Sequence, residues 1–419
     1  MSFEEELNKR RGHRAQRQRD AAARQQRVRM ILALILVAAI AVGVGILIFS
    51  MVRTHMEQME ATAPSEPETQ PSTVPEDTVI HFVAGGDVNV TDKVIGSGFN
   101  GTGYDFSDTF LDIMPILSGA DLCAVNFEGN LYSEGSASAP PELAQALKNA
   151  GVDMVQLANS RSLTYGLRGL KSTIQGIRAV GLEPLGAFMD HDEFRRSGGY
   201  TIRDIHGVRV AVVAFTKGMD GAALPAGAEN CINLLYTDYA SAYSKVDKEG
   251  INAILADIRE EKPDIIIAML HWGSEYNNKI SDSQERIVEL MLDGGVNAII
   301  GTHSHYVQKM VYSNFDNQFV AYSLGDLLGD GVAAGTNYSV LLDLQITKNG
   351  VTGETSITGF DYVPVYLFDQ TESGGGLRLL RIREAVTAYE NGYVSTVTPE
   401  VYEAMKYALE RIEARVNDE

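Results

Sequence analysis

A run of 23 residues without a charged side chain, Met30–Val52, limits the fold of this chain more than any other feature. As a helix it spans about 34 Å, enough to cross the roughly 30 Å hydrocarbon core of a bilayer. A buried core helix would show a polar stripe, and this segment has none. A cleavable signal peptide, the alternative, would have shorter apolar and basic regions. We therefore predict one uncleaved transmembrane helix over Met30–Val52.

Charged residues on either side of this segment predict its orientation. Residues 1–29 carry nine Lys or Arg and four acidic residues, whereas residues 53–77 carry one cation, Arg53. The positive-inside rule then places the N-terminus in the cytoplasm and the C-terminal part outside the cell. We expect a single-pass protein of the cell membrane with an extracellular domain. The basic arm is interpreted as a topology signal, although binding to anionic lipid or a cytoplasmic partner stays open.

The extracellular part is strongly acidic. The whole chain has a net charge of -20, and because residues 1–29 contribute +5, the remainder carries -25. Phosphate contacts require Lys and Arg, so this charge argues against nucleic acid as a partner and is compatible with metal binding. Two cysteines, Cys123 and Cys231, are too few for a thiolate zinc site. We expect Cys123 to be a buried thiol, and a single disulfide is the alternative.

Composition and periodicity divide the chain into five segments. These are a basic cytoplasmic arm (1–29), the transmembrane helix (30–52), a Pro/Glu/Ser/Thr-rich linker (53–77), a folded domain (78–370) and a C-terminal extension with a terminal helix (371–419). The linker contains four prolines and six acidic residues, and such a composition does not bury a core.

Strand-like and helix-like segments alternate in the folded domain, followed by consecutive strands, which predicts an α/β fold with mixed or packed sheets. The predicted strands are 79–84, 121–127, 152–158, 182–186, 201–205, 208–215, 264–270 and 298–301, and then 318–324, 339–347 and 355–366 as closing antiparallel strands. The predicted helices are 110–117, 141–149, 170–180, 247–260 and 283–292, with a terminal helix around 401–412.

Polar side chains of the metal-ligand type follow several of these strands. They are Asp87, Asn126, Glu128, Asn159, Ser160, His271, His303 and His305. Ligand sites in α/β sheets gather at the carboxyl ends of strands, and carboxylate with imidazole suits Mn, Fe or Zn. Two such metals can activate water for phosphoester hydrolysis. Each residue also has a simpler interpretation, because an Asp after a strand often caps a turn and His271 could be a core histidine.

The folded domain resembles the CapA-type poly-γ-glutamate capsule biosynthesis proteins, a branch of the calcineurin-like metallophosphoesterases. The matching segments, in order, are Phe82-Val-Ala-Gly-Gly-Asp87, Ala120-Asp-Leu-Cys-Ala-Val-Asn-Phe-Glu128, Leu157-Ala-Asn159, Leu270-His-Trp-Gly-Ser-Glu-Tyr276, Gly301-Thr-His-Ser-His305 and Tyr322-Ser-Leu-Gly325. The resemblance implies an α/β/β/α sandwich of two mixed sheets. It implies metal ligands at Asp87, Glu128, His271, His303 and His305, and we expect Asn126, Glu275 and Tyr276 to bind substrate.

This chain departs from the family at the catalytic motif. The family usually reads Asn-Asn-His-x-x-Asp where this chain has Asn159, Ser160, Arg161 and Thr164. The missing histidine resembles the general acid, and arginine stays protonated near neutral pH. Asn89 also lies where the superfamily often has a second histidine, and Asp326 where the family often has Asn.

Two functions follow from the resemblance. The first is a membrane-anchored factor for biosynthesis, export or retention of an anionic capsule polymer, with a degenerate catalytic site in which Asn159, Ser160 and Arg161 occupy the catalytic positions. Its partners would be the polymer or capsule-synthesis membrane proteins, and Arg161 would bind a carboxylate through its planar guanidinium. The alternative is an active metal-dependent phosphoesterase outside the cell. An inert interaction scaffold is a third possibility.

Overall fold

The computed structural model describes Gly43, Ser50, Met51 and residues 75–135, 138–393 and 396–417. The predicted transmembrane helix lies outside these residues except for Gly43, Ser50 and Met51. No helix within the described part is long and apolar enough to cross a membrane. The folded part of the chain is one compact unit, Val74–Glu419.

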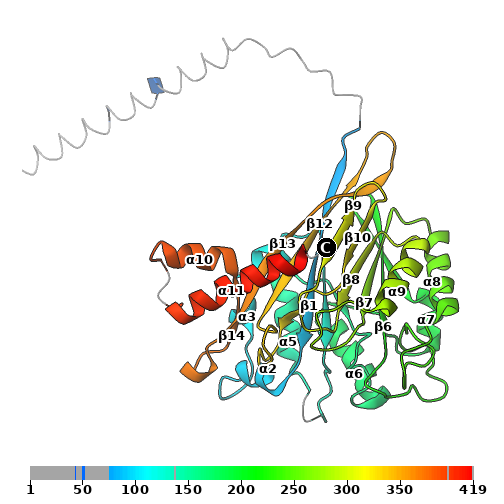
Figure 1. Cartoon of the computed structure of the whole chain (residues 1–419), viewed down its shortest axis with the longest axis horizontal. Helices are drawn as coiled ribbons and strands as arrows, with labels where there is room; N and C mark the ends of the chain where they lie inside the picture. Colours follow the sequence, from blue (N-terminus) through cyan, green and yellow to red (C-terminus); the bar gives the residue numbers. More distant parts are fainter. Residues whose placement is uncertain (1–42, 44–49, 52–74, 136–137, 394–395, 418–419) are drawn as a thin grey trace, which may run out of the picture. The chain divides into compact units, whose positions relative to one another are not determined.

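Two mixed β-sheets form the centre of this unit (Figure 1). In the described residues the larger sheet has the order β14 (Leu377–Arg381), β13 (Thr355–Asp369), β12 (Tyr338–Lys348), β1 (Thr78–Asn89), β2 (Leu122–Glu128), β3 (Met154–Gln156) and β4 (Glu183–Leu185), with β11 (Asp326–Leu328) pairing with β1. The smaller sheet has the order β5 (Tyr200–Ile205), β6 (Val208–Thr216), β7 (Ile265–His271), β8 (Ala298–Thr302), β10 (Gln318–Ala321) and β9 (Met310–Ser313).

The sheets pack face to face because side chains alternate along their strands. Ile80, Phe82 and Ala84 of β1 enter the same hydrophobic core as Val210 and Val212 of β6. The intervening side chains point to the outer faces, where two further cores lie. Sequence periodicity predicted an α/β fold with a mixed sheet or two packed sheets, and the family resemblance implied two mixed sheets. The structure confirms two packed, mixed sheets.

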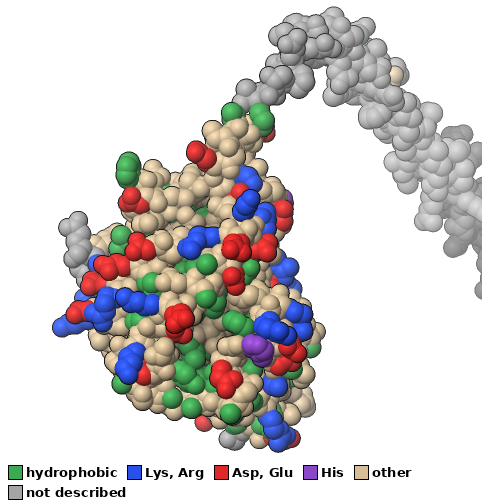
Figure 2. Space-filling model, turned by 90° about the vertical axis from the view of Figure 1, so that its right-hand side faces the viewer, with side chains coloured by type: hydrophobic (Ala, Val, Ile, Leu, Met, Phe, Trp, Pro, Cys, Tyr) green, Lys and Arg blue, Asp and Glu red, His purple; other side chains and the backbone are tan. Residues whose placement is uncertain are grey.

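Helices cover the outer face of each sheet. The larger sheet is covered by α5 (Pro141–Ala150) and α6 (Gly166–Ala179), with α2 (Asp92–Ser97), α3 (Ser107–Phe110) and α4 (Met114–Leu117) nearby. The smaller sheet is covered by α8 (Lys248–Glu260) and α9 (Asp282–Asp293), and α7 (His191–Ser197) precedes β5. On the side of the molecule that carries α7, α8 and α9, acidic and basic side chains are interspersed (Figure 2).

The C-terminal segment belongs to the same core. After β13, a 3₁₀ turn (Thr371–Ser373) leads to β14, α10 (Ile382–Glu390) and α11 (Pro399–Val416). Met405, Ala408 and Ile412 of α11 are buried in the core shared by the two sheets, at the spacing that predicted this helix. Cys123 and Cys231 are both free and buried, and burial raises the pKa of each thiol.

Three sequence predictions need correction. Strand β1 continues past Ala84 to Asn89, so that Asp87 lies inside it. The predicted helix 110–117 is two short helices, because Pro115 in one continuous helix would clash with the turn before it. The strand predicted at 318–324 runs parallel to β8 and antiparallel to β9, which periodicity did not reveal.

Gly86 permits the close approach of β1 to the segment before β11. A Cβ atom there would lie 1.9 Å from the carbonyl oxygen of Gly325, and the neighbouring amide of Asp87 donates to that oxygen at 3.0 Å. We predict that Gly86→Ala lowers the free energy of unfolding by about 3 kcal/mol, because backbone has to move. Urea unfolding of the purified chain measures this effect. The control is Gly96→Ala in α2, where nothing lies within 4 Å, and equal midpoints for the two variants would refute the prediction.

Candidate metal centre

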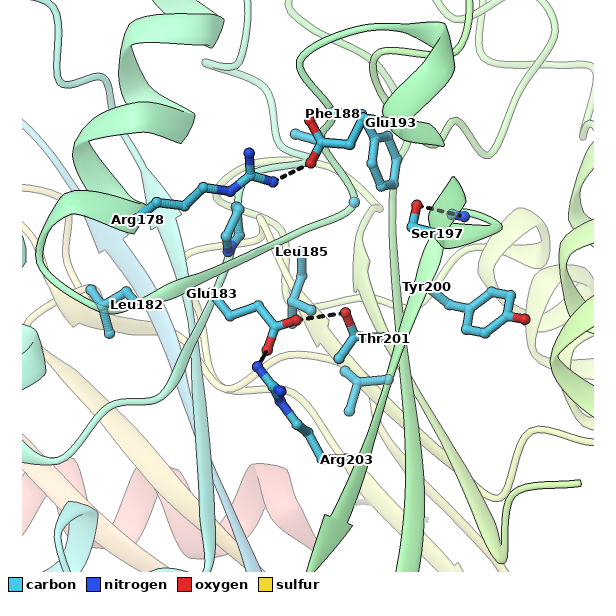
Figure 3. A pocket seen from close by; sticks show the side chains of 15 residues that line it. Arg178, Leu182, Glu183, Leu185, Phe188, Glu193, Ser197, Tyr200, Thr201 and Arg203 are labelled. Atoms are coloured by element: carbon cyan, nitrogen blue, oxygen red, sulfur yellow. Dashed lines mark hydrogen bonds and ion pairs between the residues drawn. The ribbon is translucent and has the colours of Figure 1, made fainter. Parts of the chain in front are cut away.

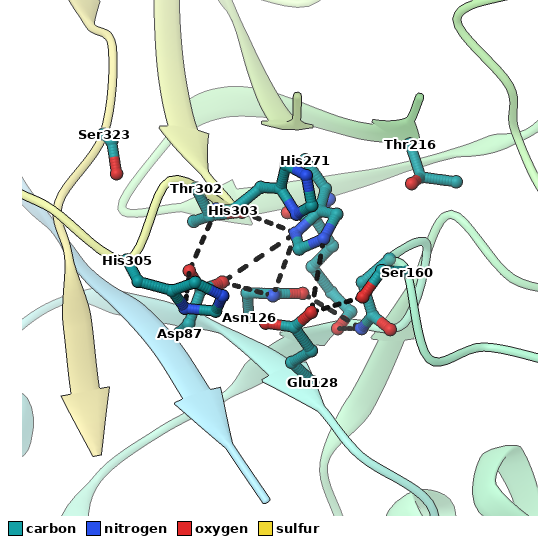
Figure 4. A network of polar contacts seen from close by, with 12 residues as sticks. Asp87, Asn126, Glu128, Ser160, Thr216, His271, Thr302, His303, His305 and Ser323 are labelled. Carbon is teal, nitrogen blue, oxygen red and sulfur yellow. Dashed lines mark hydrogen bonds and ion pairs between the residues drawn. The ribbon is translucent and has the colours of Figure 1, made fainter. Parts of the chain in front are cut away.

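The carboxyl ends of strands from both sheets meet at one place (Figure 4). Asp87 of β1 is in register with Asn126 of β2 on one side and with Asp326 of β11 on the other. In the smaller sheet, His271 ends β7 in register with Thr302 of β8. The topology therefore gathers the polar residues that the sequence placed after separate strands.

The first group of potential ligands is Glu128, His271 and His303. One ligand atom from each residue lies within 4.8 Å of the other two, and all three side chains are buried. His271 Nε2 lies 3.5 Å from Glu128 Oε1. Within the described residues, Glu128 Oε2, His271 Nε2 and both ring nitrogens of His303 have no hydrogen-bond partner. Unpartnered buried polar atoms are rare in folded proteins, and here they face one another.

The second group is Asp87, His305 and Asp326, with ligand atoms again within 4.8 Å. His305 Nδ1 is hydrogen-bonded to Asp326 Oδ1 at 2.7 Å and lies 4.0 Å from Asp87 Oδ2. Asp326 was not among the metal ligands predicted from the sequence. The sequence signal that could have indicated Asp326 as a ligand was its place directly after the matching segment Tyr322–Gly325. Only the pairing of β11 with β1 shows that Asp326 lies next to Asp87.

Two asparagines link the groups. Asn126 Nδ2 donates to Asp87 Oδ1 at 2.6 Å and lies 3.3 Å from His271 Nδ1. Asn159 Nδ2 donates to Asn126 Oδ1 at 3.1 Å and to the carbonyl of Phe127 at 2.8 Å. Asn126 is fully buried between the two groups, and Asn159 orients it.

The loop after β8 holds its histidines in an unusual backbone conformation. His303 has φ 91° and His305 has φ 60°, values that are uncommon outside glycine. The amide of His303 donates to Asp87 Oδ2 at 2.9 Å, and Ser304 Oγ donates to the carbonyl of Tyr306 at 2.8 Å. Strained residues of this kind concentrate at functional sites, where surrounding contacts hold them in place.

Burial and neighbouring charges shift the pKa of several side chains of the centre in different directions. Burial, followed by the charge of Glu128, raises the pKa of Asp87. Burial also raises the pKa of Asp326, against the influence of His305. Burial alone would raise the pKa of Glu128, but the histidines outweigh it and hold that pKa well below its usual range. Burial lowers the pKa of His303 and favours the neutral form that ligates metal.

These residues fit divalent metal. The donor set combines imidazole nitrogens with carboxylate oxygens, which suits Mn, Fe or Zn. The unpartnered atoms of Glu128, His271 and His303 are the ones that a cation would satisfy. His271 is already oriented for this role, because its other nitrogen, Nδ1, is hydrogen-bonded to Thr302 Oγ1 at 3.1 Å.

Ser160, Arg161 and Thr164 follow β3, and Ser160 lies beside the first group. Ser160 Oγ donates to Glu128 Oε1. Arg161 is half-buried, and its Nη1 donates to the carbonyl of Val90 at 2.8 Å. Thr164 is exposed, and its hydroxyl donates to the carbonyl of Arg161 at 3.0 Å. None of the three offers a group that could exchange a proton near neutral pH.

The expected substrate-binding residues occupy different places. Asn126 is fully buried between the two ligand groups. Glu275 is half-exposed on the solvent-facing side of the centre, which we call its mouth, and its Oε1 lies 4.0 Å from His305 Nε2. Tyr276 is exposed, has φ 52°, and places its ring 5.1 Å from the ring of His305. Glu275 and Tyr276 can therefore meet a ligand approaching from solvent, whereas Asn126 cannot without a change in the buried network.

A pocket of about 330 Å³ lies between β4 and β5, at the edges of the two sheets (Figure 3). Its charged groups are already paired, since Arg178 is bonded to Glu193 and Glu183 to Arg203 and Thr201. In the part of the chain that the structure describes, this pocket therefore presents no cluster like the one in the metal centre.

Residues 81–331, more than half of the chain, match the family described as bacterial capsule synthesis protein PGA_cap. The chain belongs to the PGA_cap family. This confirms the resemblance seen in the sequence. The chain is 28% identical over 263 residues to the capsule biosynthesis protein CapA of Bacillus anthracis, covering 59% of this chain and 60% of the relative. It is 26% identical over 261 residues to the PGA biosynthesis protein CapA of Bacillus subtilis, covering 60% and 64%.

The matched region thus spans about three-fifths of the length of these PGA_cap relatives. Among solved structures, the calcineurin-like phosphoesterase YfkN from Bacillus subtilis is similar, with a TM-score of 0.43 at 15% identity, covering 80% of this chain and 99% of that chain.

Asp326 provides a test of the ligand assignment. We predict that Asp326→Asn weakens metal binding about tenfold to a hundredfold at the group it shares with Asp87 and His305, because a carboxylate contact is lost. Elemental analysis after dialysis against Mn, Zn or Fe measures the content, and the metal-dependent rise in the melting temperature provides a second readout. Asp343→Asn is the control, since Asp343 pairs with the half-exposed His81. Wild-type metal content in Asp326→Asn would remove Asp326 from the ligand set.

Proposed function

We propose that this chain is a membrane-anchored, extracellular capsule protein that binds an anionic polymer, poly-γ-glutamate by analogy with its relatives, beside a divalent metal centre. Membership of the PGA_cap family supports the capsule role. The anchor would be Met30–Val52, with the basic residues before it in the cytoplasm and the capsule-synthesis machinery as membrane partner. The metal would be Mn, Fe or Zn, held by the two buried groups.

The environment of Arg161 is the observation that carries this proposal. Its guanidinium is fixed to the carbonyl of Val90, next to the end of β1 and therefore close to the centre. Of its five N–H donors, Nη1 is used in that contact, and no described carboxylate lies within 4.0 Å of it. A permanent cation with free donors binds a carboxylate well but cannot act as a general acid near neutral pH.

The two potential ligand groups favour a second candidate, a metal-dependent phosphoesterase. Two divalent ions held in adjacent sites can activate water and stabilise the leaving oxygen. The missing proton donor is the argument against this activity. Because general acid catalysis contributes about 10²- to 10⁴-fold, its loss would leave a binding protein with little turnover.

Polymer binding tests the first candidate. We predict that the purified chain binds a γ-linked glutamate oligomer in isothermal titration calorimetry, and that Arg161→Ala weakens binding about tenfold or more, as expected for loss of a charged hydrogen bond. Arg168→Ala is a matched control, because Arg168 is exposed and pairs with Glu134. Unchanged affinity in Arg161→Ala would exclude the role assigned to this residue.

Restoring the family motif tests the second candidate. The triple variant Ser160→Asn, Arg161→His, Thr164→Asp supplies the proton donor and its orienting carboxylate. We predict that, loaded with Mn or Zn, it hydrolyses a generic phosphodiester such as bis-p-nitrophenyl phosphate at least a hundredfold faster than the wild-type chain. The same variant with His303→Ala is the control for metal dependence. Comparable turnover by the wild-type chain would show that this protein is an enzyme in spite of Arg161.

A further inference from the structure

A second cation, Lys217, lies beside the metal centre and has no role in the ligand groups. It directly follows β6, whose last residue, Thr216, is in register with His271. The amide of Lys217 donates to the carbonyl of His271 at 2.8 Å, and its Nζ donates to the carbonyl of Gly273 at 2.9 Å. Both contacts fix Lys217 to the strand end that presents a metal ligand.

The ammonium group of Lys217 retains unused capacity. It lies 4.8 Å from the ring centre of Tyr243, and no described carboxylate lies within 4.0 Å. An ammonium has three donors, and the carbonyl of Gly273 uses one. Burial lowers the pKa of Lys217, while Glu275 and Asp220 act in the opposite direction. A fixed, half-buried cation of this kind is suited to an anionic partner.

Lys217 and Arg161 flank the same part of the centre. Arg161 directly follows Ser160, which is hydrogen-bonded to Glu128. Lys217 contacts the backbone of His271, and the ring nitrogen Nε2 of His271 lies 3.5 Å from Glu128 Oε1. Asp220 lies near both cations, because its carboxylate acts on Lys217 and the charge of Arg161 acts on Asp220, so one ligand group beside Asp220 can meet both.

Two acidic residues near the cations, Glu275 and Asp220, influence which ligand charge is favoured. The carboxylates of Glu275 and Asp220 act to raise the pKa of Lys217, and the charge of Arg161 acts to lower the pKa of Asp220. Asp220 has φ 50° and, within the described residues, no hydrogen bond. Two cations facing two carboxylates attract a singly charged anion and resist a second negative charge. A carboxylate thus fits better than a phosphate dianion.

We propose that Lys217 and Arg161 together form a carboxylate-binding subsite at the mouth of the metal centre. This inference rests on the proposed function and deepens it, because it assigns the contact that would hold one carboxylate of the polymer next to the metals. Lys217 supplies a point charge and Arg161 a planar fork, and together they fix both position and orientation.

The test measures calorimetric binding of a γ-linked glutamate oligomer to the metal-loaded full chain. We expect Lys217→Gln, which keeps a donor for Gly273 but loses the charge, to bind about tenfold more weakly. Lys309→Gln is the matched control, since Lys309 lies over Tyr322, 5.8 Å from its ring centre. It should bind like the wild-type chain. We expect Asp220→Asn to bind several-fold more tightly, a gain that a folding defect cannot produce.

The outcomes separate this subsite from the function on which it rests. If the wild-type chain binds no oligomer, the proposed function fails. If the wild-type chain binds and Lys217→Gln binds equally well with unchanged metal content, only the subsite is overturned. Inorganic phosphate is the second probe, and we expect it to bind more weakly than the oligomer and to gain most from Asp220→Asn. Tighter phosphate binding that Lys217→Gln abolishes would reassign the subsite to phosphate.

Discussion

The mutual burial of six ionisable side chains is the constraint on which this structure depends. Asp87, Glu128, His271, His303, His305 and Asp326 are all almost fully buried, yet several of their polar atoms have no partner within the described residues. Burying charge without compensation costs several kcal/mol per group, so a fold does not retain such a cluster for stability. A divalent cation at each group would remove the penalty, and the surrounding framework can be understood as the means of holding these side chains ready for it.

That framework depends on close backbone approaches. The amide of Asp87 bonds to the carbonyl of Gly325, which is possible because Gly86 has no side chain to occupy the space. This contact sets β11 beside β1 and aligns Asp326 with Asp87. On the smaller sheet, Gly301 has the same function, since a Cβ atom there would lie 2.0 Å from the carbonyl oxygen of Tyr322. Glycines that look like strand breakers in the sequence are therefore what brings the strand ends together.

The same glycines explain how far the sequence could predict the site. Side chains that follow the predicted strands come together in the structure, because the carboxyl ends of parallel strands share an edge. The predicted first strand ends at Ala84, whereas β1 continues through Gly85 and Gly86 with a shift in register against β2. Asp326 and Lys217 were not assigned to the site, because each reaches it only through long-range strand pairing. Local patterns specify which face a side chain occupies, but not which distant strand lies beside it.

Ser160 and Arg161 lie beside the first ligand group without disrupting it. Ser160 donates to Glu128, so this group has a hydrogen-bond partner next to it. Arg161 keeps its charge at every physiological pH and cannot exchange a proton there. A fixed cation beside buried ligand groups favours holding an anion. The net negative charge of the chain repels anions, so any attraction for an anionic ligand would have to come from a few positioned cations and from metal, if it is bound.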